Sequence, residues 1–346
     1  MSPVMRIPDH EIRHSAPIAE VSIEAPARLH FGFVDLSAGA RRYGSIGVAL
    51  ETPRTRLRAQ RAPQVVAHGP GAQRAAAYAE RLRAQLGLHG GVVLHLEQAL
   101  PEHAGLGAGT QLALAVGTAL ARLYGLALDA RELAHRLERG RRSAIGLGAF
   151  ERGGLIVDGG RRADATNPPP IVARLPLPAA WTWILIFDDR RQGLSGAEES
   201  AAFAALAPSA TAEAEALSRL VLMEILPAAA EGDLGAFGAG LTRLQDRVGD
   251  YFAPAQGGRR YRSPAVARAL AWLREHGAAA VGQSSWGPTG FALAADHAQA
   301  ETLVRAVAAA VPDAALRYVL SATRNAGAAI HATAAARRSQ GAPLSA

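Results

Sequence analysis

A glycine-rich turn between a strand-like segment and a long apolar segment limits the possible folds of this chain most strongly. The stretch GGVVLHLEQALP, residues 90–101, alternates apolar and polar side chains as a half-buried strand does. The following GLGAGTQLALAVG, residues 105–117, opens with glycines at every second position and continues as an apolar helix, which we expect to begin at Thr110. Glycines let backbone N–H groups converge, and a helix N-terminus adds roughly half a positive charge. The pattern therefore predicts a phosphate site, with a tight turn into a core helix as the alternative.

The absence of two residue types narrows the chemistry further. All 37 fixed cations are arginines, because the chain contains no lysine, and it contains no cysteine either. A Walker-type phosphate loop, a Schiff base, a lysine base and a cysteine-ligated zinc ion are therefore excluded. Anion binding must rely on backbone N–H groups, arginines or a metal ion that arrives with the ligand.

Bulk composition suggests the kind of partner. The formal charge of +7 is spread over scattered arginines, and aromatic residues make up 5% of the chain, which gives bases little to stack on. We therefore expect a small anionic substrate and no nucleic acid. No apolar run reaches the ~20 residues of a membrane span, and the N-terminus lacks the apolar core of a secretory signal. These features predict a cytoplasmic protein that is not associated with a membrane.

The order of strand and helix patterns predicts an α+β protein with two domains. We expect a flexible N-terminus over residues 1–20 and a first domain over 21–190, which ends with the buried strand WTWILIFDD. A second, helix-rich domain is expected over 191–332, in the order helix, strand, loop, strand, helix, strand. Residues 333–346 are expected to be a disordered tail.

Two further segments accompany the glycine-rich turn. APARLHFGFVDL, residues 25–36, places Arg28, His30 and Asp35 around a strand end, and SSWGPTGFALA, residues 284–294, is a second glycine loop. In this order and at these separations, the three segments resemble the three motifs of the GHMP small-molecule kinase superfamily. The resemblance implies a ribosomal-protein-S5-like N-terminal domain joined to a ferredoxin-like C-terminal domain.

The chain departs from the kinase pattern where the kinases carry their catalytic groups. Those loops usually have Ser-Ser after the second glycine, whereas this one has Ala108, Gly109 and Thr110. Gly148 and Ala149 occupy the place of the aspartate that activates the acceptor hydroxyl in many kinases. A kinase reaction would therefore lack its base.

Together with IGLGAFERGGLIVDGG, residues 145–160, these segments resemble a non-kinase branch, the β-ribofuranosylaminobenzene 5′-phosphate synthases. The resemblance implies that the chain condenses 4-aminobenzoate with 5-phosphoribosyl 1-pyrophosphate (PRPP) and releases CO2 and pyrophosphate, as a decarboxylating pentosyltransferase of tetrahydromethanopterin biosynthesis. It also implies a homodimer. An ATP-dependent small-molecule kinase and a non-catalytic protein that binds a phosphorylated metabolite remain the alternatives.

Candidate roles follow from the chemistry of these two substrates. Arg28 is the first choice to bind a phosphate, His30 to hydrogen-bond the amino group or relay a proton, and Asp35 to steady the cationic ribose. A strand-edge structural role is the alternative for His30, and a solvated turn is the alternative for the pair Arg190 and Arg191. The residues expected to bind phosphate are Gly105, Leu106, Gly107, Ala108, Gly109, Thr110, Arg190, Arg191, Ser284 and Ser285.

The acceptor and the metal ion have their own candidates. We expect the acceptor carboxylate in a dry spot with few cations, near Trp286, Thr289 and Phe150, because a bound arginine would oppose decarboxylation. Mg²⁺ is expected on the pyrophosphate, with Glu102 and Asp35 as the nearest carboxylates. No nucleotide or organic cofactor is expected.

Overall fold

The computed structural model describes residues 18–37, 39–191, 193 and 196–334. The strands in this part of the chain are β1 Ile18–Phe33, β2 Arg41–Arg42, β3 Ser45–Ala62, β4 Val66–His68, β5 Gly91–Gln98, β6 Leu155–Asp158, β7 Arg161–Arg162, β8 Ile171–Leu175, β9 Thr182–Asp188, β10 Ala280–Gln283, β11 Gly290–Ala294, β12 Leu316–Ala322 and β13 Ala329–Ala334. The helices are α1 Ala72–Gln85, α2 Ala108–Leu123, α3 Ala130–Arg136, α4 Ile145–Glu151, α5 Gly196–Ala205, α6 Thr211–Leu220, η1 Val221–Ile225, α7 Leu226–Glu231, α8 Leu234–Phe252, η2 Ala253–Gln256, α9 Pro264–Glu275 and α10 His297–Ala310.

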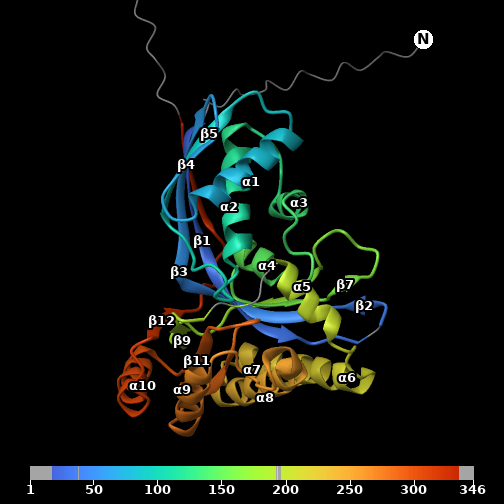
Figure 1. Ribbon diagram of the computed structural model, residues 1–346, viewed down its shortest axis with the longest axis vertical. Coiled ribbons are helices and arrows are strands. Elements are labelled where there is room, and N and C mark those ends of the chain that lie inside the picture. The colour runs from blue at the N-terminus through green and yellow to red at the C-terminus, as the bar shows by residue number, and fades with distance from the viewer. Residues whose placement is uncertain (1–17, 38, 192, 194–195, 335–346) are drawn as a thin grey trace, which may run out of the picture.

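A tall sheet forms the first layer, and helices α1 and α2 cover one of its faces (Figure 1). Its strands follow the order β13-β1-β3-β5-β4, while β6 joins it through β3 and β8 through β6. The long strands β1 and β3 pair antiparallel, and β4 pairs parallel with β5. Helix α2 is buried nearly all round, which explains its almost continuous apolar sequence.

The second layer is a four-stranded antiparallel sheet with the order β10-β11-β9-β12. Every residue of β9 is buried, because helices cover both faces of this sheet. Trp183 and Leu185 pack into the core shared with β1 and α8, whereas Ile184 and Ile186 face α9 and α10. This alternation reflects the two-residue period of a strand and explains why residues 183–187 are all apolar.

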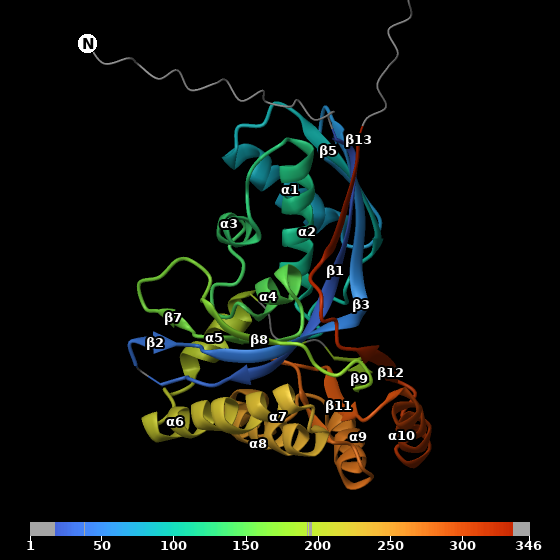
Figure 2. The ribbon, with the colours of Figure 1, turned by 180° about the vertical axis from the view of Figure 1, so that it is seen from behind.

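The α+β class is confirmed, but the strands divide differently from the predicted domains. Strand β9, which we expected in the first domain, belongs to the second sheet, so the change of sheet precedes residue 190. Strand β13 returns to pair with β1 in the first sheet, and Figure 2 shows it running alongside β1 and β3. Residues 18–20 and 333–334 are therefore strand, and the rest of the two predicted flexible ends lies outside the described residues.

The two layers meet around the end of β1. The ring of Phe31 lies 5.5 Å from that of Trp183 and 5.2 Å from that of Phe291, so the first sheet and the second share one core. The N-terminus of α2 and the loop between β10 and β11 reach the same place. Within the described part of the chain, no helix combines the length and the apolar character that crossing a membrane requires.

Candidate functional site

Helix α2 begins earlier in the glycine loop than the sequence predicts. Helix α2 begins at Ala108 rather than at Thr110, and its N-cap is Gly107, whose φ of 82° is the left-handed conformation that glycine adopts readily. The Gly107 carbonyl accepts hydrogen bonds from the N–H groups of Thr110 and Gln111, both at 3.0 Å. Thr110 is therefore not the helix cap, and backbone groups alone make this helix start, where N–H groups are free to meet an anion.

Ser284 joins the three segments that the sequence singled out. Its buried hydroxyl donates to the Gly105 carbonyl at 2.6 Å and accepts from the His30 N–H at 3.0 Å. The Ser285 N–H donates to the His30 carbonyl at 3.0 Å. The predicted assembly of the first strand, the glycine loop and the second glycine loop is thus present, with Ser284 at its centre.

Arg28 lies directly against the glycine loop. Its backbone N–H donates to the Leu106 carbonyl at 3.1 Å, and its guanidinium donates to the Gly105 carbonyl. A Cβ placed on Gly107 would lie 3.2 Å from the Arg28 side chain, so the two residues are in contact. Burial lowers the pKa of Arg28 to about 10 while nearby Glu199 opposes the shift, so the guanidinium is charged at neutral pH.

His30 is a buried histidine whose ring has no hydrogen-bond partner. Its side chain is 3% exposed, and neither ring nitrogen meets a donor or acceptor in the part of the chain that the structure describes. Burial, and then the charge of Arg28, lower the pKa of His30 to about 3. The imidazole is therefore neutral at physiological pH and has one free donor and one free acceptor. Such a group suits a hydrogen bond to a ligand better than the strand-edge role considered as the alternative.

The depressed pKa of His30 gives the first testable prediction. An unfolded chain protonates this ring near pH 6.5, whereas the folded chain keeps it neutral to about pH 3. Stability should therefore fall as the pH drops below 6.5, by up to ~1.4 kcal/mol per pH unit. We expect His30→Leu to lose less stability than the wild type between pH 7.5 and 5.5, as measured by urea unfolding. The exposed His89→Leu variant should match the wild type, and an equal loss in His30→Leu would contradict the prediction.

The acceptor candidates Trp286 and Thr289 lie in the same loop, between β10 and β11. Trp286 is 5% exposed and packs edge-on against Phe203 and Phe252, with ring centroids 5.2 and 4.7 Å away. Thr289 is fully buried, and its hydroxyl lacks a partner among the described residues. The predicted apolar and polar groups thus lie in one loop, and their role in acceptor binding stays a prediction.

Three predicted residues contact other parts of the fold. Arg190 pairs with Asp188 at 2.8 Å and with Asp313 at 3.0 Å, because β9 belongs to the second sheet and ends beside the start of β12. The backbone N–H of Arg191 donates to the Asp188 carbonyl in the same turn. Phe150 packs into the core beneath α1 and α2, as α4 turns its apolar side inward. The ion pairs of Arg190 are those of a surface turn, the alternative considered for the arginine pair. Phe150 and Trp286 lie in different core clusters, and the part of Phe150 in acceptor binding stays a prediction.

Each of the two predicted metal ligands has a partner within the protein. One Asp35 carboxylate oxygen accepts from both the backbone and the hydroxyl of Ser37, at 2.8 and 2.6 Å, so it closes its own turn. Glu102 forms an ion pair with Arg74. Over the described ranges, no group of three or more His, Asp or Glu side chains has the arrangement of a metal site. The part of Asp35 and Glu102 in binding Mg²⁺ stays a prediction.

Several polar residues at the glycine loop had no signal in the sequence. Arg74, Tyr78 and Arg139 surround Gly109, the second residue of α2. Glu199 pairs with Arg142 at 3.3 Å and accepts a hydrogen bond from the Trp286 indole, and burial raises the pKa of its carboxyl. Only the spacing of Arg74 and Tyr78, which lie one helical turn apart, could have indicated a shared face.

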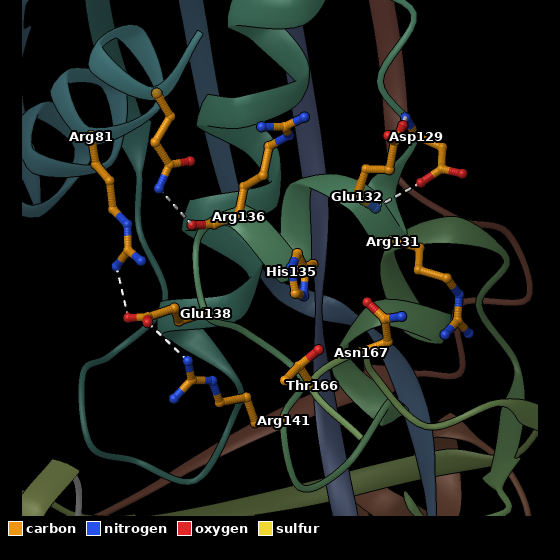
Figure 3. Close-up of a pocket in the computed structure, with 11 residues that line it drawn as sticks. Arg81, Asp129, Arg131, Glu132, His135, Arg136, Glu138, Arg141, Thr166 and Asn167 are labelled. Atoms are coloured by element: carbon orange, nitrogen blue, oxygen red, sulfur yellow. Dashed lines mark hydrogen bonds and ion pairs between the residues drawn. The ribbon is translucent and has the colours of Figure 1, made fainter. Parts of the chain in front are cut away.

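A pocket of about 680 Å³ opens beside α1 and α3 (Figure 3). Its walls are strongly charged, and Figure 3 shows Arg81 and Arg141 reaching toward Glu138 from two sides. The corresponding ion pairs measure 2.9 and 2.8 Å. This pocket is therefore largely neutralised by its own side chains.

Comparison with known proteins first defines the class. The GHMP kinases N terminal domain family matches residues 73–153, and the GHMP kinases C terminal family matches residues 225–313. The structure of homoserine kinase from Cytophaga hutchinsonii aligns with a TM-score of 0.64 at 16% identity, covering 93% of this chain and all of the kinase. Such a low identity establishes the fold alone. The matches to both domain families place the chain in the GHMP class of proteins, and the fold agrees with them.

Curated relatives then define the family within that class. The β-ribofuranosylphenol 5′-phosphate synthase of Methanothermobacter thermautotrophicus is 31% identical over 293 residues, which cover 78% of this chain and 88% of the relative. That of Archaeoglobus fulgidus is 34% identical over 238 residues, which cover 65% and 75%. The chain belongs to the β-ribofuranosylphenol 5′-phosphate synthase family and is therefore an enzyme. This confirms the resemblance inferred from the sequence motifs.

Proposed function

We propose that this enzyme joins the ribosyl 5-phosphate of PRPP to a para-substituted benzoate and releases CO2 and pyrophosphate, in tetrahydromethanopterin biosynthesis. The observation that carries the proposal is the cluster at the glycine loop. Arg28 donates to the Gly105 carbonyl, and Ser284 links the same carbonyl to the backbone of His30, whose neutral ring has no partner among the described residues. Membership of a family of synthases supports it. A decarboxylating pentosyltransferase is the class of enzyme that this reaction requires.

The reaction needs charge stabilisation and orientation but no side-chain nucleophile. As the bond from ribose C1 to the pyrophosphate oxygen breaks, Arg28 and the N–H groups of α2 stabilise the leaving anion. The ring carbon that bears the carboxylate forms a bond to C1. The bond to the carboxylate then breaks, its electron pair restores the aromatic ring, and CO2 leaves. Holding the two substrates in line contributes up to ~7–11 kcal/mol in favourable cases.

His30 is proposed to bind the substituent opposite the carboxylate. A neutral imidazole accepts a hydrogen bond from an amine or a hydroxyl, which increases electron donation into the ring at the carbon that attacks. The resemblance of the sequence motifs predicts 4-aminobenzoate as the acceptor. The relatives are instead named after a ribofuranosylphenol, which is the product expected from 4-hydroxybenzoate. Both acceptors use the same chemistry, so a direct competition between the two benzoates decides the specificity.

The other partners of the enzyme remain proposals as well. We propose that Mg²⁺ arrives on the pyrophosphate, since the described carboxylates form no cluster for it. The proposal further includes a cytoplasmic homodimer that binds no nucleic acid and uses no organic cofactor.

One assay tests the proposed reaction against both alternatives. Purified enzyme with PRPP, Mg²⁺ and carboxyl-labelled 4-aminobenzoate or 4-hydroxybenzoate should release labelled CO2 in step with pyrophosphate. A chelator should stop this release if the metal arrives with PRPP. Binding of PRPP without release of labelled CO2 would instead support a non-catalytic protein, and ATP consumption with an alcohol would support a kinase.

A further inference from the structure

Three side chains from separate segments converge on Gly109 at the start of α2. A Cβ built on this glycine would lie 3.6 Å from Arg74 Nη1, 3.6 Å from the Tyr78 hydroxyl and 3.7 Å from Arg139 Nη1. Arg74 and Tyr78 stand one turn apart on α1, and Arg139 follows α3. Two guanidinium groups and a phenol thus surround Gly109, which has no side chain of its own.

The protein balances the charges at this point only in part. Arg74 pairs with Glu102, whereas Arg139 donates to the neutral Tyr78 hydroxyl and lies over its ring at 5.2 Å. The Nε–H of Arg139 is buried and has no partner in the described part of the chain. Glu138, the adjacent acid, is held by Arg81 and Arg141, as Figure 3 shows.

This imbalance points to a missing anion. Like charges that meet at one point repel each other, and a buried donor without a partner is costly, so both features favour a negatively charged ligand between the side chains. The guanidinium fork matches phosphate oxygens in two parallel hydrogen bonds, and the nearby helix N-terminus adds to the attraction.

We propose that Arg74, Tyr78 and Arg139 form a second anion subsite over Gly109. It takes the terminal phosphate of a pyrophosphate group, while Arg28 beside Gly107 takes the phosphate joined to the sugar. The proposal rests on the proposed function, because a pyrophosphate is the ligand with two linked phosphates to place along this helix start. It also explains why position 109 carries no side chain, since a methyl group there would occupy the space of the phosphate.

Two variants test the subsite from opposite sides. Arg139→Met removes the charge and the fork. Gly109→Ala fills the space, and its Cβ makes only ordinary contacts at 3.6 Å and beyond, so the chain should fold as stably as the wild type. Arg141→Met is the matched control. It removes an equal charge two residues after Arg139, and the Arg141 side chain pairs with Glu138.

The readout is the affinity for inorganic pyrophosphate and for ribose 5-phosphate, measured by calorimetry at fixed Mg²⁺ with full-length protein. We expect Arg139→Met and Gly109→Ala each to weaken pyrophosphate binding by roughly 10-fold or more, with ribose 5-phosphate changed less than about twofold. Arg141→Met should resemble the wild type. Thermal melting checks that each variant is folded.

The subsite is overturned if both variants keep the wild-type affinity for pyrophosphate, or if Arg141→Met weakens it as much as Arg139→Met. Equal weakening for both ligands would also overturn it. Failure of the proposed function has a different signature: the wild type then binds pyrophosphate in the predicted, variant-sensitive way but releases no labelled CO2.

Discussion

Replacing Arg28 with alanine is expected to lower turnover by at least ~100-fold, the size of effect produced by loss of a preorganised charge contact. Arg28 is the cation in direct contact with the glycine loop at Gly105 and Gly107, and it stays charged despite its burial. If it stabilises the departing pyrophosphate, the loss should appear mainly in kcat rather than in KM for the benzoate. Release of labelled CO2 at saturating and limiting substrate separates the two parameters.

Arg58→Ala provides the control for lost positive charge. Arg58 is 56% exposed and pairs with Glu97 at 2.6 Å on strand β3, so its removal should leave activity near the wild-type value. Near-normal turnover in Arg28→Ala would exclude Arg28 from the site. A comparable loss in both variants would instead mean that net charge, and not this contact, controls the rate.

Replacing Gly105 with alanine is expected to cause the second large loss, again ~100-fold or more. Gly105 has a φ of 75°, and a Cβ there would come closer than 3.0 Å to the Ser284 carbonyl oxygen. The loop must then move away from Ser284, which holds it against the first strand. A shift of about 1 Å at a site that orients two substrates costs on the order of 100-fold in rate.

Gly125→Ala separates this displacement from backbone strain. Gly125 follows α2 with a φ of 67°, and a Cβ there would meet nothing within 4 Å. It should lose about 1 kcal/mol of stability, as other residues do in the left-handed conformation, and keep its turnover. If Gly105→Ala loses no more activity than Gly125→Ala, the close approach to Ser284 does not position the loop.

Local pattern predicted most elements and the meeting of the three motifs. The lysine-free glycine loop, the apolar α2 and the buried β9 each have a residue pattern or composition that predicts local structure. Sequence reasoning placed Arg28, His30 and Ser284 together correctly, because their segments resemble a known arrangement. It grouped β9 with the first domain, whereas β9 pairs with β11 and β12 in the second sheet, since a strand buried on both faces has no polar side to indicate its neighbours.

The charged residues of the site were harder to predict. Arg190 was chosen for its place after a buried strand, yet its carboxylate partners Asp188 and Asp313 come together only when β9 pairs with β12. Arg74 and Arg139 lie 65 positions apart in the sequence and converge on Gly109 only after α1 packs beside α2. A long side chain contacts whatever the fold brings within reach, so its sequence position carries little information about its role.

The sequence by itself determined that an anion site here relies on backbone N–H groups, on arginines or on a metal ion that arrives with the ligand, because glycine spacing and the absence of lysine can be read directly from the sequence. It also determined the family, through three motifs that are each continuous in the chain. Only the tertiary structure decided which arginines reach the loop, that the His30 ring is neutral and has no partner among the described residues, and that Glu102 pairs with Arg74. Burial and pairing between distant segments set these properties, and neither is encoded in a local stretch of sequence.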